Sequence, residues 1–333
     1  MKRILALLLV IATTGILLAK VTTPSPTGGS KPELLSVPAG EADEGGSKFS
    51  TRTYPLADFT SLDVTNVVKV IYTQGASYKV QLTGRTDWLD LMEVTSIGGT
   101  LKVQAKKTKK FDNVKKKDQP DGEHNFILHL TAPCLQNIDL GGVSEFKAKR
   151  LTPDQLRVHL GGVSKFKVDA LECATLNLSV TGVSEADVDH ITCQKLQAEV
   201  RGSSKADIDH LSTKEASFII SGASKVNLPQ FTQGERATFG LNGASELTLS
   251  SEVSGDMNLG LAGASKGKLT FKGGILRTVC TGASKLHAEV NCRKLNANCD
   301  GASKTDFSGT ADEVEIDRSG VAVNIDTSRL NQF

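Results

Sequence analysis

The sequence predicts an all-β protein: a parallel β-helix, or solenoid, of about 20-residue rungs, with an N-terminal β portion on the same stack. Three observations lead to this prediction. A phrase of Gly, a small residue, Ser and then Glu or Lys recurs at nearly constant spacing, apolar residues alternate around it, and no stretch has a helical period long enough for a crossover helix. The phrase begins at Gly142, Gly162, Gly182, Gly202, Gly222, Gly243, Gly263, Gly282 and Gly301.

Apolar residues fill every second position on both sides of each repeated glycine. Around Gly182 these residues are Leu176, Leu178, Val180, Ala186 and Val188. Such alternation is typical of a strand with one buried face. A further apolar residue nine positions after the glycine, such as Leu171 or Ile191, indicates a third short inward segment. We therefore expect three short strands per rung; leucine-rich repeats are the competing solenoid, but their Leu-x-x-Leu-x-Leu phrase is missing.

Serine follows the glycine by two positions in all nine copies. Stacked rungs turn this position into a column in which each hydroxyl both donates and accepts, so that hydrogen bonds can pass upward through a dry corner. The glycine before it permits the positive φ of a tight bend. No matching column of bases is present, so we interpret the serines as a structural ladder and not as nucleophiles. The ladder comprises Ser144, Ser164, Ser184, Ser204, Ser224, Ser245, Ser265, Ser284 and Ser303.

A charged residue follows each of these serines. Its sign alternates over the first four copies, whereas the last three copies all carry Lys. Opposite charges one rung apart attract weakly and like charges repel weakly, both screened by solvent. A solvated edge with partial charge pairing is the favoured interpretation, with a ligand-binding stripe as the alternative.

The chain divides into four regions. Residues 1–19, with a basic start and a short apolar run, have the character of a signal peptide, although a retained anchor is left open. Residues 20–50 are rich in Pro and Gly and predict a flexible linker. Residues 51–130 form the N-terminal β portion, and residues 131–333 form the repeat solenoid, with a C-terminal cap near 320–333. We expect an exported protein located in the periplasm, on the outer membrane or at the cell surface.

The cysteines fall into register with the rungs. Cys173 and Cys193 share one column, and Cys280 and Cys299 share another, so each pair should be spatial neighbours. Parallel stacked side chains hold their Cβ atoms slightly far apart for a disulfide. We expect a buried thiol ladder for Cys280 and Cys299, and we leave a bridge or free thiols open for Cys173 and Cys193. No Cys-x-x-Cys spacing points to a metal site.

Two neighbouring copies share the phrase Ala-Asp-Val/Ile-Asp-His. Stacking would place Asp187 over Asp207, Asp189 over Asp209 and His190 over His210. Carboxylates and imidazoles so arranged could ligate Ca²⁺ or a transition metal. The alternative is a set of solvated outward positions, because lysines occupy the same column in the preceding copies. Otherwise no cofactor is expected.

A lysine-rich segment precedes the repeats. It offers a patch for an anionic polysaccharide or for lipid headgroups, with a solvated loop as the alternative. The candidate polyanion-binding residues are Lys106, Lys107, Lys109, Lys110, Lys115, Lys116 and Lys117.

Nearly constant rung length leaves little loop from which to build a catalytic cleft. No nucleotide-binding phrase or Ser-His-Asp arrangement is present. The formal net charge of +2 gives no argument for nucleic acid. These observations favour a non-enzymatic binding or scaffold module, with a polysaccharide-binding or polysaccharide-processing β-helix as the alternative.

The chain resembles the exported bacterial family of auto-transporter adhesins with a head GIN domain. The resemblance rests on the opening from Arg52 to Val64, the Val68-Lys69-Val70 and Gly99-Thr100-Leu101 segments, the Ala132-Pro133 step and the Gly-x-Ser rungs. It covers about residues 50–330 and implies a β-helical surface or periplasmic domain with an adhesin-like role and no catalytic residues. An envelope glycan or a host or matrix protein is the implied partner, and the oligomeric state is left open.

Overall fold

The computed structural model describes residues 48–106, 115–253, 255–320 and 323–332. This part is almost entirely β-structure, with one short helix, α2 (Thr86–Leu89), and one 3-10 turn, η1 (Lys116–Asp118). The predicted signal peptide and nearly all of the predicted linker lie outside it. The first two residues of strand β1 (Phe49–Tyr54) fall within the predicted linker. No helix among the described residues is long and apolar enough to cross a membrane.

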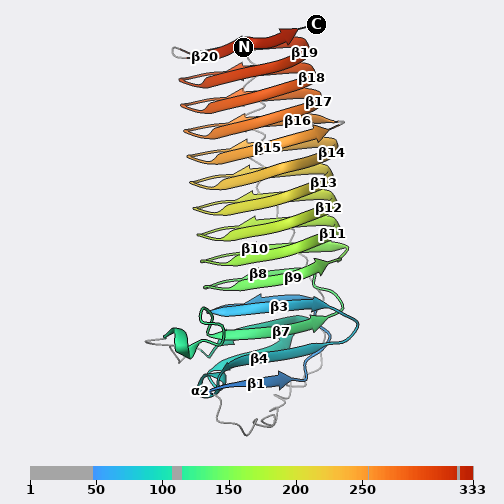
Figure 1. Cartoon of the computed structure of the whole chain (residues 1–333), viewed down its shortest axis with the longest axis vertical. Helices are drawn as coiled ribbons and strands as arrows, with labels where there is room; N and C mark the ends of the chain where they lie inside the picture. Colours follow the sequence, from blue (N-terminus) through green and yellow to red (C-terminus); the bar gives the residue numbers. More distant parts are fainter. Residues whose placement is uncertain (1–47, 107–114, 254, 321–322, 333) are drawn as a thin grey trace, which may run out of the picture. The chain divides into compact units, whose positions relative to one another are not determined.

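The repeats form a parallel β-solenoid, as the sequence predicts (Figure 1). Each rung lies in register on the next; Glu185 to Val200, for example, pairs with Lys205 to Ile220. The strands are β8 (Asn137–Leu140), β9 (Glu145–Leu151), β10 (Gln155–Leu160), β11 (Lys165–Val180), β12 (Glu185–Val200), β13 (Lys205–Ile220), β14 (Lys225–Leu241), β15 (Glu246–Val253), β16 (Asp256–Leu261), β17 (Lys266–Cys280), β18 (Lys285–Cys299), β19 (Lys304–Arg318) and β20 (Asn324–Gln332).

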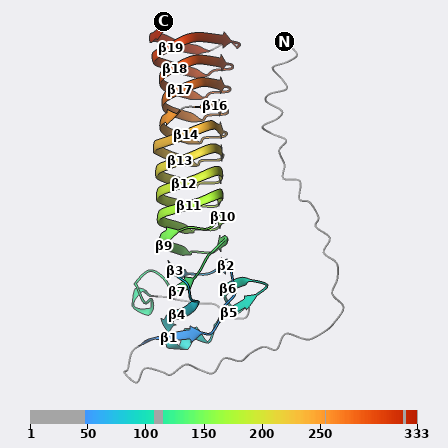
Figure 2. The same cartoon turned by 90° about the vertical axis from the view of Figure 1, so that its right-hand side faces the viewer.

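The three short strands expected per rung are instead one long strand in most copies, such as the 16 residues of β12. The pairing of β11 with β12 is interrupted only at Asp169 and Ala174, so these two long strands pair in three segments. Figure 2 shows the rungs stacked on one another. The predicted inward positions are nonetheless correct. Inward residues on the successive sides of a rung are at most 1 % exposed, as are Val180, Val188, Ile191 and Leu196.

Equivalent side chains stack inside the solenoid and form one continuous core. The rings of Phe146 and Phe166 lie parallel with centroids 5.3 Å apart, and those of Phe218 and Phe239 are 5.0 Å apart. Their burial supplies the main stabilisation of each rung, because each large apolar side chain removed from water contributes about 1.5–3 kcal/mol.

The repeated glycine makes the corner of each rung. All nine glycines have positive φ, between 69° and 86°. A Cβ added to Gly162 would lie 2.5 Å from the carbonyl oxygen of Gly142, so the corner has no room for a side chain. That carbonyl accepts a hydrogen bond from the amide of Val163 at 2.8 Å. Glycine is therefore required both for the bend and for the close approach of the rungs.

The serines of the ladder are buried, at most 2 % exposed, but the expected chain of hydroxyl hydrogen bonds is limited to one contact of 3.5 Å, between Ser245 and Ser265. Most hydroxyls donate to the carbonyl three residues earlier in the same corner, as Ser164 does to Gly161 at 2.7 Å. A weaker contact reaches the rung below, as from Ser204 to the Gly182 carbonyl at 3.2 Å. The nearer carbonyl is preferred because it faces the hydroxyl within the turn. The serine closes its own corner.

The N-terminal β portion continues the stack below the repeats. It comprises β1, β2 (Ser61–Val64), β3 (Val68–Gln74), β4 (Lys79–Arg85), β5 (Met92–Ile97), β6 (Thr100–Ala105) and β7 (Phe126–Ala132). β2 and β3 pair in parallel with β8 and β9. Between them, Asn66 takes the glycine position of the corner, with φ of 88°. The run from Leu62 to Tyr72 is therefore two sides of a rung and not one strand.

We expect Gly202→Ala to destabilise the protein, because it forces an L-residue to a φ of 86° and places a Cβ 2.6 Å from the Gly182 carbonyl. Strain and overlap together should lower the free energy of unfolding by about 2–4 kcal/mol, measured by urea denaturation. Gly240→Ala is the control, since its Cβ would meet nothing closer than 3.9 Å. Equal effects of the two substitutions would contradict this account of the corner.

Candidate functional site

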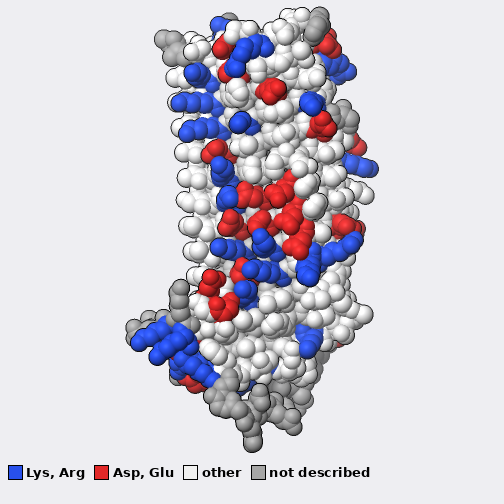
Figure 3. All heavy atoms as spheres, in the orientation of Figure 1, with Lys and Arg blue, Asp and Glu red and all other residues white. Residues whose placement is uncertain are grey.

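The outward side chains of β9 and β11–β13 form a strongly charged face. Figure 3 shows acidic residues gathered at mid-height of the stack with basic residues directly below them. Stacking in register produces this grouping, because Asp187 lies beside Asp207 in the next rung and beside Lys167 in the previous one. Lys167 Nζ lies 2.8 Å from the Asp187 carboxylate, and Lys205 pairs with both Asp207 and Glu185.

The structure brings the two predicted histidines together. The rings of His190 and His210 are parallel with centroids 4.4 Å apart, and Nδ1 of His210 is buried without a hydrogen-bond partner. Asp189 and Asp209 precede them in adjacent rungs. Across the described ranges, however, no three His, Cys, Asp or Glu side chains are grouped closely enough to hold a metal ion. The stacking is as predicted, but no ligand set is assembled there.

Only some of the predicted polyanion-binding lysines lie within the described residues. Lys107, Lys109 and Lys110 lie outside it. Lys106 donates to the carbonyl of Asp90 at 2.7 Å, whereas Lys115 and Lys117 are exposed and Lys116 begins η1. A polyanion-binding role for this segment stays a prediction.

Both predicted cysteine pairs are neighbours in register, Cys173 with Cys193 and Cys280 with Cys299. All six cysteines are free thiols, so the bridge left open for Cys173 and Cys193 is not present. Cys280 and Cys299 point into the core and are fully buried. Burial also raises the pKa of the Cys292 thiol to about 11. A buried, protonated thiol such as Cys292 acts as a small core residue and not as a nucleophile.

An ionic cluster at the base of the repeats could not be found from the repeat pattern. His124 Nδ1 lies 3.0 Å from Asp121 Oδ2, Lys69 Nζ lies 3.2 Å from the same carboxylate, and Glu145 bridges Lys69 and Lys147 at 3.5 and 2.9 Å. Burial opposes the ionisation of Asp121, but the amides of His124 and Glu123, the His124 ring and Lys69 outweigh it and lower its pKa. The cluster fastens the irregular segment after η1 to β3 and β9.

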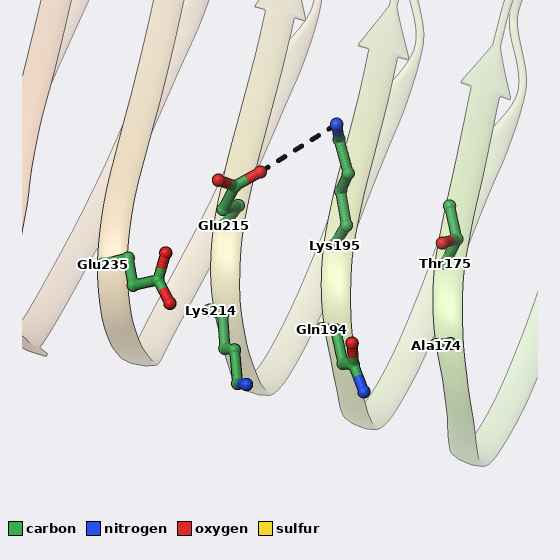
Figure 4. Close-up of a pocket in the computed structure, with 7 residues that line it drawn as sticks. All are labelled: Ala174, Thr175, Gln194, Lys195, Lys214, Glu215 and Glu235. Carbon is green, nitrogen blue, oxygen red and sulfur yellow. Dashed lines mark ion pairs between the residues drawn. The ribbon is translucent and has the colours of Figure 1, made fainter.

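The surface hollows are open and lie between rungs. The larger, of about 320 Å³, follows a bend of β11–β14 and contains Lys195 and Glu215, whose charged atoms are 3.9 Å apart (Figure 4). The second lies over the charged face beside Lys167 and Asp187. Neither combines a nucleophile with a base. These features are suited to contact with an extended partner and not to the enclosure of a small substrate.

Comparison of the sequence with known protein families identifies the family of this chain. Residues 58–247, more than half of the chain, match the family described as "putative auto-transporter adhesin, head GIN domain". The chain belongs to this family. The match begins in the N-terminal β portion and runs into β15, so the family unit includes both parts of the stack.

Solved structures with a similar chain path include two bacterial proteins described as putative adhesins. The Bacteroides fragilis protein is 19 % identical, with 84 % of this chain and 97 % of that chain covered and a TM-score of 0.39. The Parabacteroides distasonis protein is 17 % identical, with 85 % and 98 % covered and a TM-score of 0.44. A P. distasonis protein described as a putative lipid binding protein is 12 % identical, with 84 % and 98 % covered and a TM-score of 0.46. No curated protein matches the chain.

We expect Asp121→Asn to destabilise the protein in a pH-dependent way. Because the native pKa of Asp121 is lowered, its contribution is fully present above the unfolded pKa of about 3.9 and is lost as the pH falls toward the native value. The loss at neutral pH should be about 1–2 kcal/mol in the free energy of unfolding.

Urea denaturation of wild type and variant from neutral to acidic pH measures this effect, and the difference between them should shrink as the pH falls. Asp312→Asn is the control, because Asp312 is exposed and makes no ion pair within the described chain. A difference that stays constant with pH would show that Asp121 acts without its charge.

Proposed function

We propose that this protein is an exported, non-enzymatic binding module of the cell envelope that acts as an adhesin. Its partner is an envelope glycan or a host or matrix protein, bound along the outer faces of the solenoid. Membership of the adhesin family and the signal-like start of the sequence both support this proposal.

The observation that carries the proposal is the uniformity of the rungs. The one 21-residue spacing, from Gly222 to Gly243, is absorbed inside β14 by register shifts opposite Thr213 and Glu215. The extra residue therefore does not become a loop. Enzymes need a pocket that excludes water and positions reacting groups, whereas the hollows along the described rungs are open. A regular surface of columns favours many weak contacts with a long partner.

We expect the purified full-length protein to bind members of a panel of envelope glycans and matrix proteins, measured by biolayer interferometry, and to release no new reducing ends from any bound glycan. Binding without turnover supports the proposal. Turnover that is lost in the double variant Asp189→Asn/Asp209→Asn would replace it with a polysaccharide-processing function on the charged face. Absence of binding across the panel would contradict the adhesin role.

A further inference from the structure

The charged column that follows the serine ladder changes character along the stack. Its residues are Glu145, Lys165, Glu185, Lys205, Lys225, Glu246, Lys266, Lys285 and Lys304. In the middle of the column the charges neutralise one another: Lys205 lies 3.7 Å from Glu185, and Lys225 lies 3.5 Å from Glu246. Lysine and carboxylate there form part of the stack itself.

The upper end of the column has no such neutralisation. Lys266, Lys285 and Lys304 are in register on β17, β18 and β19, all three are exposed, and none forms an ion pair with any described residue. Figure 3 shows basic side chains stacked along one edge of the upper rungs. We call these three residues the lysine ladder.

The carboxylates nearest the lysine ladder already have partners: Glu246, which is in register with Lys266, lies 3.5 Å from Lys225. Lys268, one alternate position further along β17, is also exposed and makes no ion pair among the described side chains. The nearby carboxylate of Asp306 is already held by Arg329 at 2.7 and 2.8 Å and by His287 at 2.9 Å. The pKa of Asp326 is lowered mainly by the hydrogen bond that its carboxylate accepts from the Ser328 amide, and only to a lesser extent by the charge of Lys304.

The like charges of the ladder repel one another. Rungs are spaced by about 4.8 Å, so the backbone positions of the three lysines follow one another at that interval along the solenoid axis. Direct like-charge neighbours are mildly destabilising. The small residues beside the ladder, Ala264, Ala283 and Ala302, are exposed and leave it open to approach. A partner with regularly spaced negative charges would remove the repulsion and gain attraction from every rung.

The chemistry of the surrounding surface selects among polyanions. Single-stranded nucleic acid is held by aromatic stacking platforms, and membrane surfaces by inserted apolar side chains. The exposed large apolar residues of the described chain are Ile97, Val143, Val163, Val183 and Ile219, none of which is aromatic and none of which lies on β17–β19. A linear sugar polymer with one carboxylate or sulfate per unit needs neither feature.

We propose that the lysine ladder, together with Lys268, binds a linear acidic polysaccharide that runs along the solenoid axis over β17–β19. This proposal rests on the proposed adhesin function and names the chemical class of one partner and its site. Because strand pairing fixes the backbone of the column, binding of the polymer orders only the lysine side chains.

The test compares two triple variants that remove the same charge from the same column. Lys266→Gln/Lys285→Gln/Lys304→Gln removes the lysine ladder. Lys165→Gln/Lys205→Gln/Lys225→Gln removes three lysines that each have a glutamate of the same column in register on a neighbouring rung. The full-length proteins are titrated with polygalacturonate, with dextran sulfate and with uncharged dextran, at low and at high salt, by biolayer interferometry.

The wild type should bind a charged polymer and not dextran, with affinity that falls as salt rises. The ladder variant should lose about tenfold or more in affinity, whereas the control variant should lose much less. Preference for polygalacturonate or for dextran sulfate distinguishes carboxylate from sulfate recognition. Thermal unfolding of both variants should stay near that of wild type, because the substituted side chains are exposed or half-exposed.

Three results would overturn the proposal. The first is no binding of either charged polymer by the wild type, and the second is an equal loss of affinity in the two variants. The third is a ladder variant that is changed only in its self-association, measured by light scattering. If one of these results were obtained while the ladder variant still bound partners from the glycan and matrix panel, the adhesin function would stand and only the polysaccharide site would be rejected. If the wild type bound neither the panel members nor the charged polymers, both the adhesin function and the polysaccharide site would be rejected.

Discussion

The close contact between successive glycine corners is the constraint on which the rest of the structure depends. From Gly162 onward, each corner glycine places its α-carbon against the carbonyl of the preceding repeat glycine, where an added Cβ would lie only 2.5–3.0 Å from that oxygen. The contact sets the register, since a shift of one residue would move every inward side chain to the outer face. Serine then satisfies a carbonyl of the same corner. The glycine corner thus determines the register of the rungs, and the register determines which side chains stack in the core and which stack on the outer surface.

Fixed register converts sequence into ladders on the outside of the molecule as well as in the core. The Asp187–Asp207 and His190–His210 stacks arise only because their copies are 20 residues apart. The same rule limits function, because an insertion either breaks the corner contact or must be absorbed as a bulge. The extra residue of β14 is absorbed in this way. A solenoid so constrained diversifies by changing the residues of its columns and not by growing loops.

The periodic part of the structure could be predicted from the sequence, and the aperiodic part could not. Inward positions, the glycine corner and both cysteine pairs follow from counting, because register is a property of spacing alone. The partner of the Ser164 hydroxyl could not be predicted in this way, since its choice between two carbonyls depends on local turn geometry. Asn66 escaped the glycine pattern because asparagine is the other residue that tolerates positive φ.

The Asp121–His124–Glu145 cluster was beyond prediction for a different reason. Its members come from an irregular segment and from the first repeat, and nothing in their sequence separation indicates that they meet. A short aspartate turn, in which Asp121 accepts the amides of Glu123 and His124, provides a local signal for the turn alone. The ion pairs to Lys69 depend on the folded stack.

The charged column separates what the fold requires from what it merely permits. Every residue of the column follows a buried serine and precedes an inward position, so the backbone environment is the same from Glu145 to Lys304. Both signs occur there, and the corner therefore does not demand lysine. The mixed signs at mid-column are explained by the ion pairs of Lys205 with Glu185 and of Lys225 with Glu246. Three consecutive lysines without ion-pair partners among the described residues are not explained by stability, because like charges in register oppose it; such a feature points to a partner outside the chain.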